Sequence, residues 1–296
     1  MISVCIPIHE YNVLPLAQSI AAQFNADECE LVCIDDGSST ECIERNRPVA
    51  ELGQYIVLGE NVGRARVRNL FAHYAKGDWM LFLDDDCIVT EGFMARYREV
   101  MSDIVDVIVG GRVYDTRFND REHRLRYRYG QLVECRTAAQ RSLEPYKSFM
   151  TNNFLIRRSM FESIRFDERL LGYGHEDTLF GYRLRQAGAR IHHIDNPVTN
   201  GDVETNAEFL QKSSEAVESL SQIYDYMQSD KEFCNSVRLL RTYARLHSAG
   251  LLNLMLALFR CTRKCIHAKL ENRHCISLEM FNFYKLGLFI EKRLTK

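Results

Sequence analysis

Short apolar runs alternate with helical patterns over the first third of the chain, and this alternation limits the possible folds more than any other feature. The runs typical of strands are 2–6, 30–34, 55–58 and 79–83. The amphipathic segments typical of helices are 14–24 and 63–74. Strand, helix and strand at this spacing indicate a parallel sheet covered by helices. We therefore predict an α/β fold with a mainly parallel sheet flanked by helices.

The pattern becomes less regular beyond residue 106. Further strand-like runs are 107–111, 153–156 and 190–194. Residues 112–147 are polar and rich in arginine and tyrosine, which is typical of a long functional loop or a mobile helical insert. From residue 206 helical periodicity dominates. We predict one α/β domain over 1–206, with 112–147 as an insert, and a helical C-terminal extension over 207–296.

Length, charge and hydropathy exclude several classes of protein. A chain of 296 residues with 46% apolar residues can bury a large core, so disorder is excluded. A formal net charge of -2 provides no basic field for nucleic acid. Because the given sequence opens on a strand-like run, we do not expect secretion. The longest apolar stretch, 249–259, is too short to span a bilayer.

The cysteines point to a reducing compartment. They form no Cys-x-x-Cys pair, and several lie inside strand-like runs, as expected of buried, reduced thiols rather than of disulfides or a zinc site. The ten positions are 5, 29, 33, 42, 87, 135, 234, 261, 265 and 275. We expect a cytoplasmic protein, with the inner face of the cell membrane as a further location.

Two acidic turns follow predicted strands. Asp84, Asp85 and Asp86 come directly after the run 79–83, and Asp35 and Asp36 end the run 30–34. Adjacent carboxylates repel one another, and Mg²⁺ or Mn²⁺ bound together with substrate phosphates removes that repulsion. The alternative for each is a solvated turn. Because ligands bind beyond the carboxyl ends of parallel strands, two such turns favour a metal that carries a phosphorylated ligand.

Five motifs in this order resemble family 2 glycosyltransferases of the GT-A fold, of the bacterial surface-glycan type. They are 6–8 (Ile-Pro-Ile), 34–38 (Ile-Asp-Asp-Gly-Ser), 61–69, 83–86 (Leu-Asp-Asp-Asp) and 172–177 (Gly-Tyr-Gly-His-Glu-Asp). The resemblance covers roughly residues 1–215. It implies a Rossmann-like GT-A domain and a metal-dependent, inverting transfer of a hexose-type unit from a nucleotide-diphosphate sugar, UDP-linked, to a saccharide or lipid-linked saccharide. Polysaccharide biosynthesis is the implied setting, with 112–147 on the acceptor side.

The resemblance also implies where the nucleotide-sugar lies. Its base is expected against Pro7, His9 and Glu10 and against Asp36, with Asp35 beside it, because a carboxylate can accept from a uracil N–H. His9 and Glu10 stand where Tyr and Asn are common in the family. A plain turn is the alternative for the Asp-Gly-Ser sequence after the second strand.

Three arginines alternate at the start of the second helical segment. Arg64 and Arg68, four residues apart, share one side of a helix and are the candidates for contact with the nucleotide. For Arg66 a solvated position is the favoured interpretation.

For the metal, the resemblance implies Asp84 and Asp86 as ligands of Mn²⁺ or Mg²⁺, with Asp84 facing the ribose or the metal. The cation bridges the two phosphates and acts as a Lewis acid on the departing nucleotide. Asp85 is expected to support the loop beside the nucleotide-sugar.

A third metal ligand is implied downstream, where many members of the family have a histidine. His192 and His193 lie in a strand-like run, where a core histidine is the commoner outcome. The expected position, after the Asn-Pro turn, carries Asn200, so Asn200 or a water molecule would take that place.

Glu176 and Asp177 are the implied catalytic pair. An inverting transfer needs a base within hydrogen-bond reach of the incoming hydroxyl, and the family uses an acid of this motif, here Asp177. The alternative is a helix start that favours acidic side chains, and one motif can serve both purposes. Asn152 and Asn153 either bond sugar hydroxyls or form a structural turn.

The C-terminal part combines apolar and basic residues. Residues 251–259 are apolar and are followed by Arg260, Arg263, Lys264 and Lys269, and 281–294 is again apolar and basic. A basic amphipathic helix can lie on an anionic membrane surface. The alternative is packing on the catalytic domain or on a second subunit of an oligomer.

Two other functions compete. A nucleotidyltransferase acting on sugar phosphates normally carries a Gly-rich, basic phosphate loop after its first strand, and residues 7–10 have none. A non-catalytic nucleotide-binding module would not need the distant pair Glu176 and Asp177.

Overall fold

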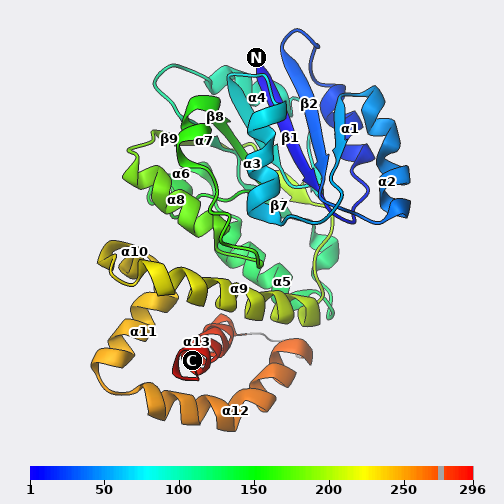
Figure 1. Cartoon of the computed structure of the whole chain (residues 1–296). Coiled ribbons are helices and arrows are strands. Elements are labelled where there is room, and N and C mark those ends of the chain that lie inside the picture. Colours follow the sequence, from blue (N-terminus) through cyan, green and yellow to red (C-terminus); the bar gives the residue numbers. More distant parts are fainter. Residues whose placement is uncertain (273–276, 296) are drawn as a thin grey trace. The chain divides into compact units, whose positions relative to one another are not determined.

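The computed structural model describes residues 1–272 and 277–295. The chain divides into two compact units. The first comprises residues 1–115, 133–171 and 176–202, and the second comprises 116–132, 172–175 and 203–296. The predicted α/β fold with a helical C-terminal part is confirmed (Figure 1). The domain boundary at residue 206, between the α/β domain and the helical extension, remains a prediction.

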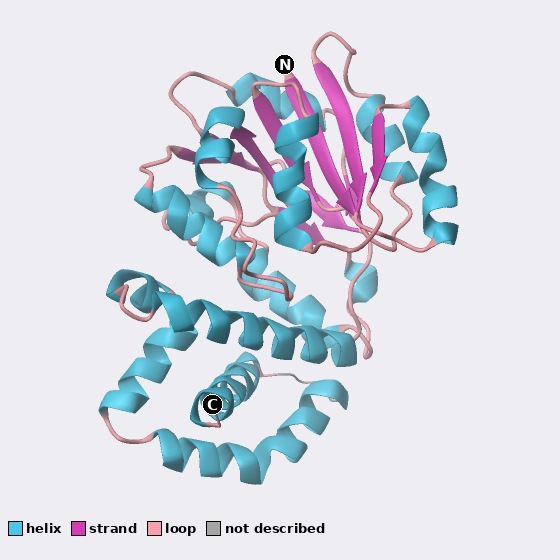
Figure 2. Ribbon diagram, in the orientation of Figure 1, coloured by secondary structure: helices cyan, strands magenta, loops and turns pink. Residues whose placement is uncertain are grey.

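Strands and helices alternate in the first unit (Figure 2). The strands are β1 (Ile2–Ile8), β2 (Cys29–Asp35), β3 (Gln54–Val57), β4 (Trp79–Leu83), β5 (Cys87–Ile88), β6 (Val107–Val109), β7 (Arg112–Tyr114), β8 (Asn153–Arg157), β9 (Ile191–His193) and β10 (Val198–Asn200). The helices of this unit are α1 (Leu14–Ala21), α2 (Thr40–Asn46), η1 (Arg47–Glu51), α3 (Arg64–Tyr74), α4 (Phe93–Val100), η3 (Gly130–Glu134, which crosses into the second unit), α6 (Ala138–Ser142), α7 (Arg158–Ile164) and α8 (Glu176–Gln186).

Seven strands of the described residues form one sheet in the order β3-β2-β1-β4-β8-β6-β9. They are the seven runs that the sequence predicts as strands. β1 to β4 pair in parallel, β8 is antiparallel to both β4 and β6, and β9 is parallel to β6. The order reverses at β1, because β2 lies on one side of it and β4 on the other. A crevice for ligands is expected beyond the carboxyl ends of β1 and β4.

Alternate residues of each strand enter separate cores on the two faces of the sheet. In β4, Leu81 and Leu83 pack with side chains of α1 and α4, whereas Met80 and Phe82 pack with side chains of α3, α7 and α8. This alternation follows from the two-residue period of a strand. The strands therefore read as continuous apolar runs because both faces are covered.

Phenylalanines dominate the core beneath α8. Phe82 stacks on Phe154 with ring centroids 4.9 Å apart, and Phe180 of α8 stacks on Phe166 at 4.3 Å. Gly181 allows the helix to approach the chain before β8, since a Cβ there would lie 2.4 Å from the carbonyl oxygen of Tyr146. These contacts fix the helix whose first turn carries the predicted catalytic pair.

A smaller sheet, in the order β5-β10-β7, was not predicted from the sequence. Its strands have two or three residues, too few to show a period. Asn200 pairs with Cys87 on one side and with Tyr114 on the other. The sheet thereby connects the end of the acidic triplet to the start of the 112–147 segment, which forms short helices rather than one open loop.

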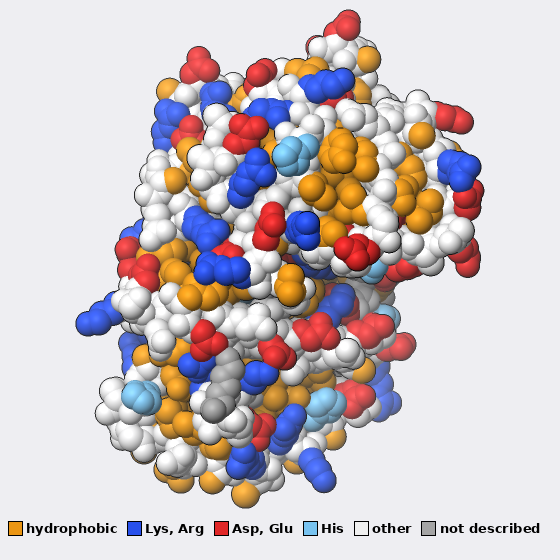
Figure 3. Space-filling model, in the orientation of Figure 1, with side chains coloured by type: hydrophobic (Ala, Val, Ile, Leu, Met, Phe, Trp, Pro, Cys, Tyr) orange, Lys and Arg blue, Asp and Glu red, His pale blue; other side chains and the backbone are white. Residues whose placement is uncertain are grey.

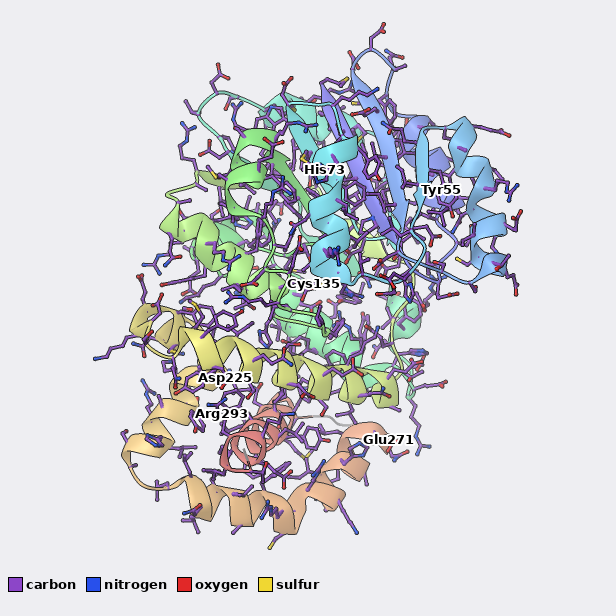
Figure 4. The ribbon with its side chains drawn as sticks, in the orientation of Figure 1. Tyr55, His73, Cys135, Asp225, Glu271 and Arg293 are labelled. Atoms are coloured by element: carbon purple, nitrogen blue, oxygen red, sulfur yellow. The ribbon has the colours of Figure 1, made fainter. Side chains whose placement is uncertain are left out.

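The second unit consists of helices. They are η2 (Thr116–Phe118), α5 (Arg124–Tyr129), α9 (Asn206–Met227), α10 (Lys231–Ser236), α11 (Arg238–Ser248), α12 (Leu252–Asn272) and α13 (Leu278–Leu294). Helices α9, α11 and α12 surround α13, whose Phe281 and Phe289 are buried (Figure 1). Arg293 of α13 pairs with Asp225 of α9 (Figure 4). No described helix combines the length and apolarity that crossing a membrane requires.

Replacing Phe82 by alanine tests the core. Phe82 has no exposed surface and lies between rings on three sides, so we expect Phe82→Ala to lower the free energy of unfolding by about 3–5 kcal/mol. Urea unfolding can be followed by fluorescence, because the chain's single tryptophan, Trp79, lies in the same strand. Leu143→Ala, at a side chain that is 82% exposed, is the control and should change the free energy of unfolding by less than about 0.5 kcal/mol. Equal effects would contradict the assigned core.

Candidate functional site

Hydrogen bonds join the carboxyl ends of β1, β2 and β4 at the point where the strand order reverses. The backbone N–H of His9 donates to Oδ2 of Asp85 at 3.1 Å, and the His9 ring nitrogen Nδ1 lies 3.1 Å from the carbonyl oxygen of Asp36. The N–H of Asp36 donates to the carbonyl of Ile8 at 2.8 Å. Residues predicted from three separate motifs are therefore brought together at one edge of the sheet.

The carboxylate of Asp36 holds the loop that leads into α3. It accepts from the backbone N–H of Val62 at 2.7 Å and from that of Gly63 at 3.1 Å. Gly37, in the left-handed region with φ 69°, lets the loop approach, since a Cβ there would lie 2.4 Å from the carbonyl carbon of Glu60. Asp36 thus has a structural role, and its contact with a nucleotide base remains a prediction.

Asp35 is buried and bonded within its own turn. It accepts from the N–H of Ser38 at 2.8 Å and from the hydroxyl of Tyr55 at 2.9 Å (Tyr55 is labelled in Figure 4). Both contacts keep the end of β2 rigid.

Glu10 and Pro7 flank this turn. Glu10 accepts from the N–H of Ser39 at 2.5 Å and from its hydroxyl at 2.8 Å, and these bonds lower the pKa of Glu10. Ser39 in turn caps α2 by accepting from Cys42. Pro7 lies within β1, paired in register with Ile34. A role of either residue in nucleotide binding remains a prediction.

Arg68 is buried and pairs with the acidic triplet. The Arg68 side chain is only 2% exposed and donates to Oδ1 of Asp84 at 2.6 Å, and its contact with the nucleotide remains a prediction. Arg68 therefore fixes the first carboxylate of the triplet. Arg64 is exposed at the start of α3 and its charge acts on Asp85, so it stays a candidate for an anionic ligand. Arg66 is exposed, as expected.

The three carboxylates of the triplet crowd one another. Burial and the charge of Asp84 raise the pKa of Asp85 to about 6, although the N–H of His9 and the charge of Arg64 act in the opposite direction. Within residues 1–272 and 277–295, no three His, Cys, Asp or Glu side chains gather as a complete metal site. Two carboxylates completed by substrate phosphates and water are nevertheless the usual Mg²⁺ arrangement, so Asp84 and Asp86 fit a divalent cation.

Asn200 lies next to Asp86 with a fixed orientation. Its Nδ2 donates to Oδ2 of Asp86 at 3.0 Å, and its Oδ1 accepts from the guanidinium of Arg112. Rotating the amide would turn its NH₂ group towards the donor Arg112, so the nitrogen must face Asp86. Asn200 therefore supports the carboxylate of Asp86 as a hydrogen-bond donor. Its amide oxygen faces Arg112 and not the expected metal position beside Asp86.

The two histidines considered as a third ligand lie on β9. His193 is buried, with Nδ1 3.1 Å from Arg141 and Nε2 3.0 Å from the carbonyl of Pro145, and burial lowers the pKa of His193 to about 4. It is a core histidine. His192 is exposed on the same strand.

The predicted catalytic pair begins α8. Oδ1 of Asp177 accepts from the N–H of Thr178 at 2.6 Å and from its hydroxyl at 3.2 Å, and no described residue is hydrogen-bonded to Oδ2. Burial and the neighbouring Glu176 raise the pKa of Asp177 to about 7, and Glu134 adds to the effect. Glu176 is buried, and its Oε2 has no hydrogen-bond partner among the described residues.

Glu134 links the catalytic pair to the acidic triplet. Its carboxylate lies 3.5 Å from the guanidinium of Arg112 and accepts from the hydroxyl of Tyr114. Arg112 also holds Asn200, which donates to Asp86, so one chain of polar contacts runs from Asp86 to Glu134. The charge of Glu134 also contributes to the raised pKa of Asp177.

The two asparagines before β8 differ. The amide of Asn153 is fully buried and used internally, because it accepts from Tyr97 and donates to the carbonyls of Gly111 and Asn196. Asn153 thus has a structural role, and its contact with a sugar remains a prediction. Asn152 is also buried, but neither amide atom has a partner in the described residues, and its backbone carbonyl accepts from Asp84.

Three further residues, Arg112, Tyr114 and Glu134, could not be singled out from the sequence. They lie in the polar segment predicted for the acceptor side, where the density of arginine and tyrosine was the available signal. No motif singles out these three, because their proximity depends on the short strands β7 and β10.

Residues 3–165 match the family described as Glycosyl transferase family 2. Solved structures are similar in fold. A mannosyltransferase from Pyrobaculum calidifontis, in complex with GDP-Man and Mn²⁺, has a TM-score of 0.58 at 14% identity over 99% of this chain and 86% of that one. Glucosyl-3-phosphoglycerate synthase from Mycobacterium tuberculosis, with Mg²⁺ and UDP, has 0.53 at 16% identity over 76% and 78%.

A third structure, S. aureus TarS 1–349, has a TM-score of 0.52 at 15% identity over 100% of this chain and 92% of that one. No curated relative matches the chain. At these identities the solved structures establish the fold alone.

Arg68 and Arg66 provide a matched test of the ion pair at Asp84. Arg68→Met removes a buried partner and leaves the Asp84 carboxylate beside two others, so we expect the free energy of unfolding to fall by about 3 kcal/mol. Arg66→Met, two residues away and exposed, should change it by less than about 0.5 kcal/mol. Urea unfolding at pH 7 measures both. A small effect at Arg68 would mean that the pair does not form.

Proposed function

The chain belongs to glycosyl transferase family 2, and we propose that it moves a hexose-type sugar from a nucleotide-diphosphate donor, UDP-linked, to a hydroxyl of a saccharide or lipid-linked saccharide with inversion. One observation carries the proposal. It is the set of contacts from His9 to Asp85 and from Asp86 through Asn200 and Arg112 to Glu134, whose charge helps to raise the pKa of Asp177. These contacts support a common site for the acidic turns and Asp177.

The donor is proposed to lie across the carboxyl ends of β1, β2 and β4. Its base would contact the turn at Asp36, and its phosphates would lie near Arg64 and the triplet. The position is supported by the strand-order reversal, where α/β sheets bind nucleotides. The neighbours solved with GDP-Man or UDP support the donor class.

Asp84 and Asp86 are the proposed holders of a divalent cation, Mn²⁺ or Mg²⁺. Such an ion supplies Lewis-acid stabilisation of the charge on the departing diphosphate. Arg68 orients Asp84, and Asn200 orients Asp86 through its amide hydrogen. Burial, with the charge of Asp84 added to it, raises the pKa of Asp85, and this supports a demand for positive charge here.

Asp177 is the proposed base. Thr178 occupies Oδ1 and orients the carboxylate, so Oδ2 would take the proton of the acceptor hydroxyl. A base whose pKa lies near the working pH combines ionisation with affinity for the proton. Buried Glu176 keeps that pKa high, and Asn152 is a candidate for contact with the sugar.

Polysaccharide or surface-glycan assembly in the cytoplasm is the proposed setting. The nine described cysteines are free thiols, five of them buried, which supports a reducing compartment, and Cys275 lies outside the described residues.

Donor hydrolysis tests the reaction and the metal site. With Mn²⁺ and a panel of UDP- and GDP-sugars, we expect slow release of UDP from one UDP-sugar, abolished by EDTA and restored by added Mn²⁺. Asp86→Ala should reduce the rate at least about 100-fold, because it removes charge stabilisation of the leaving group. Asp103→Ala, at a fully exposed carboxylate, is the control and should keep the wild-type rate. Pyrophosphate release from a nucleoside triphosphate would instead favour nucleotidyl transfer.

The pH profile tests the base. Because the pKa of Asp177 is raised to about 7, the ionised fraction falls as the pH drops through 7, so the rate should fall about tenfold per pH unit below it. Asp177→Asn should lower the plateau rate by about 100-fold or more and remove this acid limb. A variant that keeps the acid limb at a reduced rate would assign the base to another group.

A further inference from the structure

Residues 233–270 carry basic residues and no acidic one, in a chain whose formal net charge is -2. The segment spans α11 and nearly all of α12, joined by a short turn at 249–251. Its basic residues are Arg238, Arg241, Arg245, Arg260, Arg263, Lys264 and Lys269. Such a one-sided charge over two consecutive helices calls for either internal acidic partners or an anionic partner outside the chain.

Internal partners account for only part of this charge. Arg260 and Arg263 both pair with Glu291 of α13, at 2.9 and 3.0 Å. Within the described residues, by contrast, no carboxylate pairs with the remaining side chains that lie at the surface. Of these, Arg238, Arg245 and Lys264 are exposed, and Arg241 and Lys269 are partly exposed. Two helices thus present unneutralised positive charge.

The same segment exposes large apolar side chains. Leu254 is 68% and Leu258 50% exposed, and Leu251 in the turn is also exposed. With Cys261 and Cys265, both exposed, they recur at intervals of three and four residues, which places them along one side of α12. Figure 3 shows hydrophobic side chains along the lower edge of the helical unit, where α12 lies in Figure 1.

The opposite side of α12 is already used for packing. Leu256 and Phe259 are buried, and Phe259 lies against Gly287 of α13, where a Cβ would come within 2.1 Å of its ring. The helix therefore needs neither of its exposed leucines for the core. Helix α13, the other apolar and basic segment, is the centre of this unit and has no comparable free face.

We propose that α11 and α12 form a docking surface for an anionic phospholipid bilayer. Leu251, Leu254 and Leu258 enter the headgroup region, and the exposed side chains of Arg238, Arg245 and Lys264 contact lipid phosphates. The exposed leucines and the exposed cations of this patch are both complementary to an anionic bilayer. Each Lys or Arg near such a surface raises the affinity about fivefold. A second copy docked through the same patch would bring like charges together, which disfavours a symmetric dimer there. This docking does not depend on the sugar-transfer reaction, so a failure of the docking proposal would leave the proposed reaction intact.

Vesicle sedimentation of the full chain tests the proposal. We expect the protein to sediment with vesicles containing 30% phosphatidylglycerol in phosphatidylcholine at low salt, and not with pure phosphatidylcholine. The variant with Leu254→Ser and Leu258→Ser should bind at least tenfold more weakly, and Arg245→Glu should weaken binding about 25-fold, the factor for two units of charge. Leu143→Ser and Lys76→Glu, exposed positions of the other unit, are the matched controls and should bind as wild type.

Native cysteines give a second measurement on the unmodified protein. Cys261 and Cys265 should react with a maleimide in solution and become protected by anionic vesicles, whereas the reactivity of Cys135 should not change. Absence of vesicle binding at low salt, or equal loss in the control variants, would overturn the proposal. A dimer in solution that Leu254→Ser and Leu258→Ser dissociates would also overturn it, because the patch would then be a protein interface.

Discussion

The reversal of strand order at β1 is the constraint on which the candidate site depends. Parallel strands end at the same edge of a sheet, and the reversal leaves the ends of β1 and β4 without a crossing helix between them. The His9 N–H bond to Asp85 crosses this point and ties the two strand ends together. Every other part of the site is built outward from there: the Asp36 turn on one side, and Asn200 with Arg112 on the other.

Charge accumulates at this edge, and the structure balances it only in part. Arg68 neutralises Asp84 from within the core, while Asn200 gives Asp86 a neutral donor. Burial raises the pKa of Asp85 and that of Asp177, and a neighbouring carboxylate adds to the effect at each. Negative charge that is only partly neutralised lowers the stability of the fold, but it leaves these carboxylates able to bind a positively charged ligand or to exchange a proton. The strongly bonded residues, Asp35, Asp36 and Asn153, instead supply rigidity.

The sequence predicted the large sheet well because most of its strands are buried and read as apolar runs, as β1, β2, β4, β6 and β8 do. It failed where structure depends on few residues. β5, β7 and β10 are too short for periodicity, so the contact of Asn200 with Arg112 could not be foreseen. The pairing of Arg68 with Asp84 was likewise not foreseen, because helical spacing places Arg68 beside Arg64 but does not say which side faces the core.

The most direct test of the central claim is a crystal structure of the chain with UDP and Mn²⁺. We predict that the diphosphate lies beyond the carboxyl ends of β1 and β4, with the metal bound to Asp86 and the base beside the Asp36 turn. The Oδ2 atom of Asp177 should face the open side of the β-phosphate, where the sugar would be attached. A nucleotide bound elsewhere, or a metal bound without Asp86, would contradict the account.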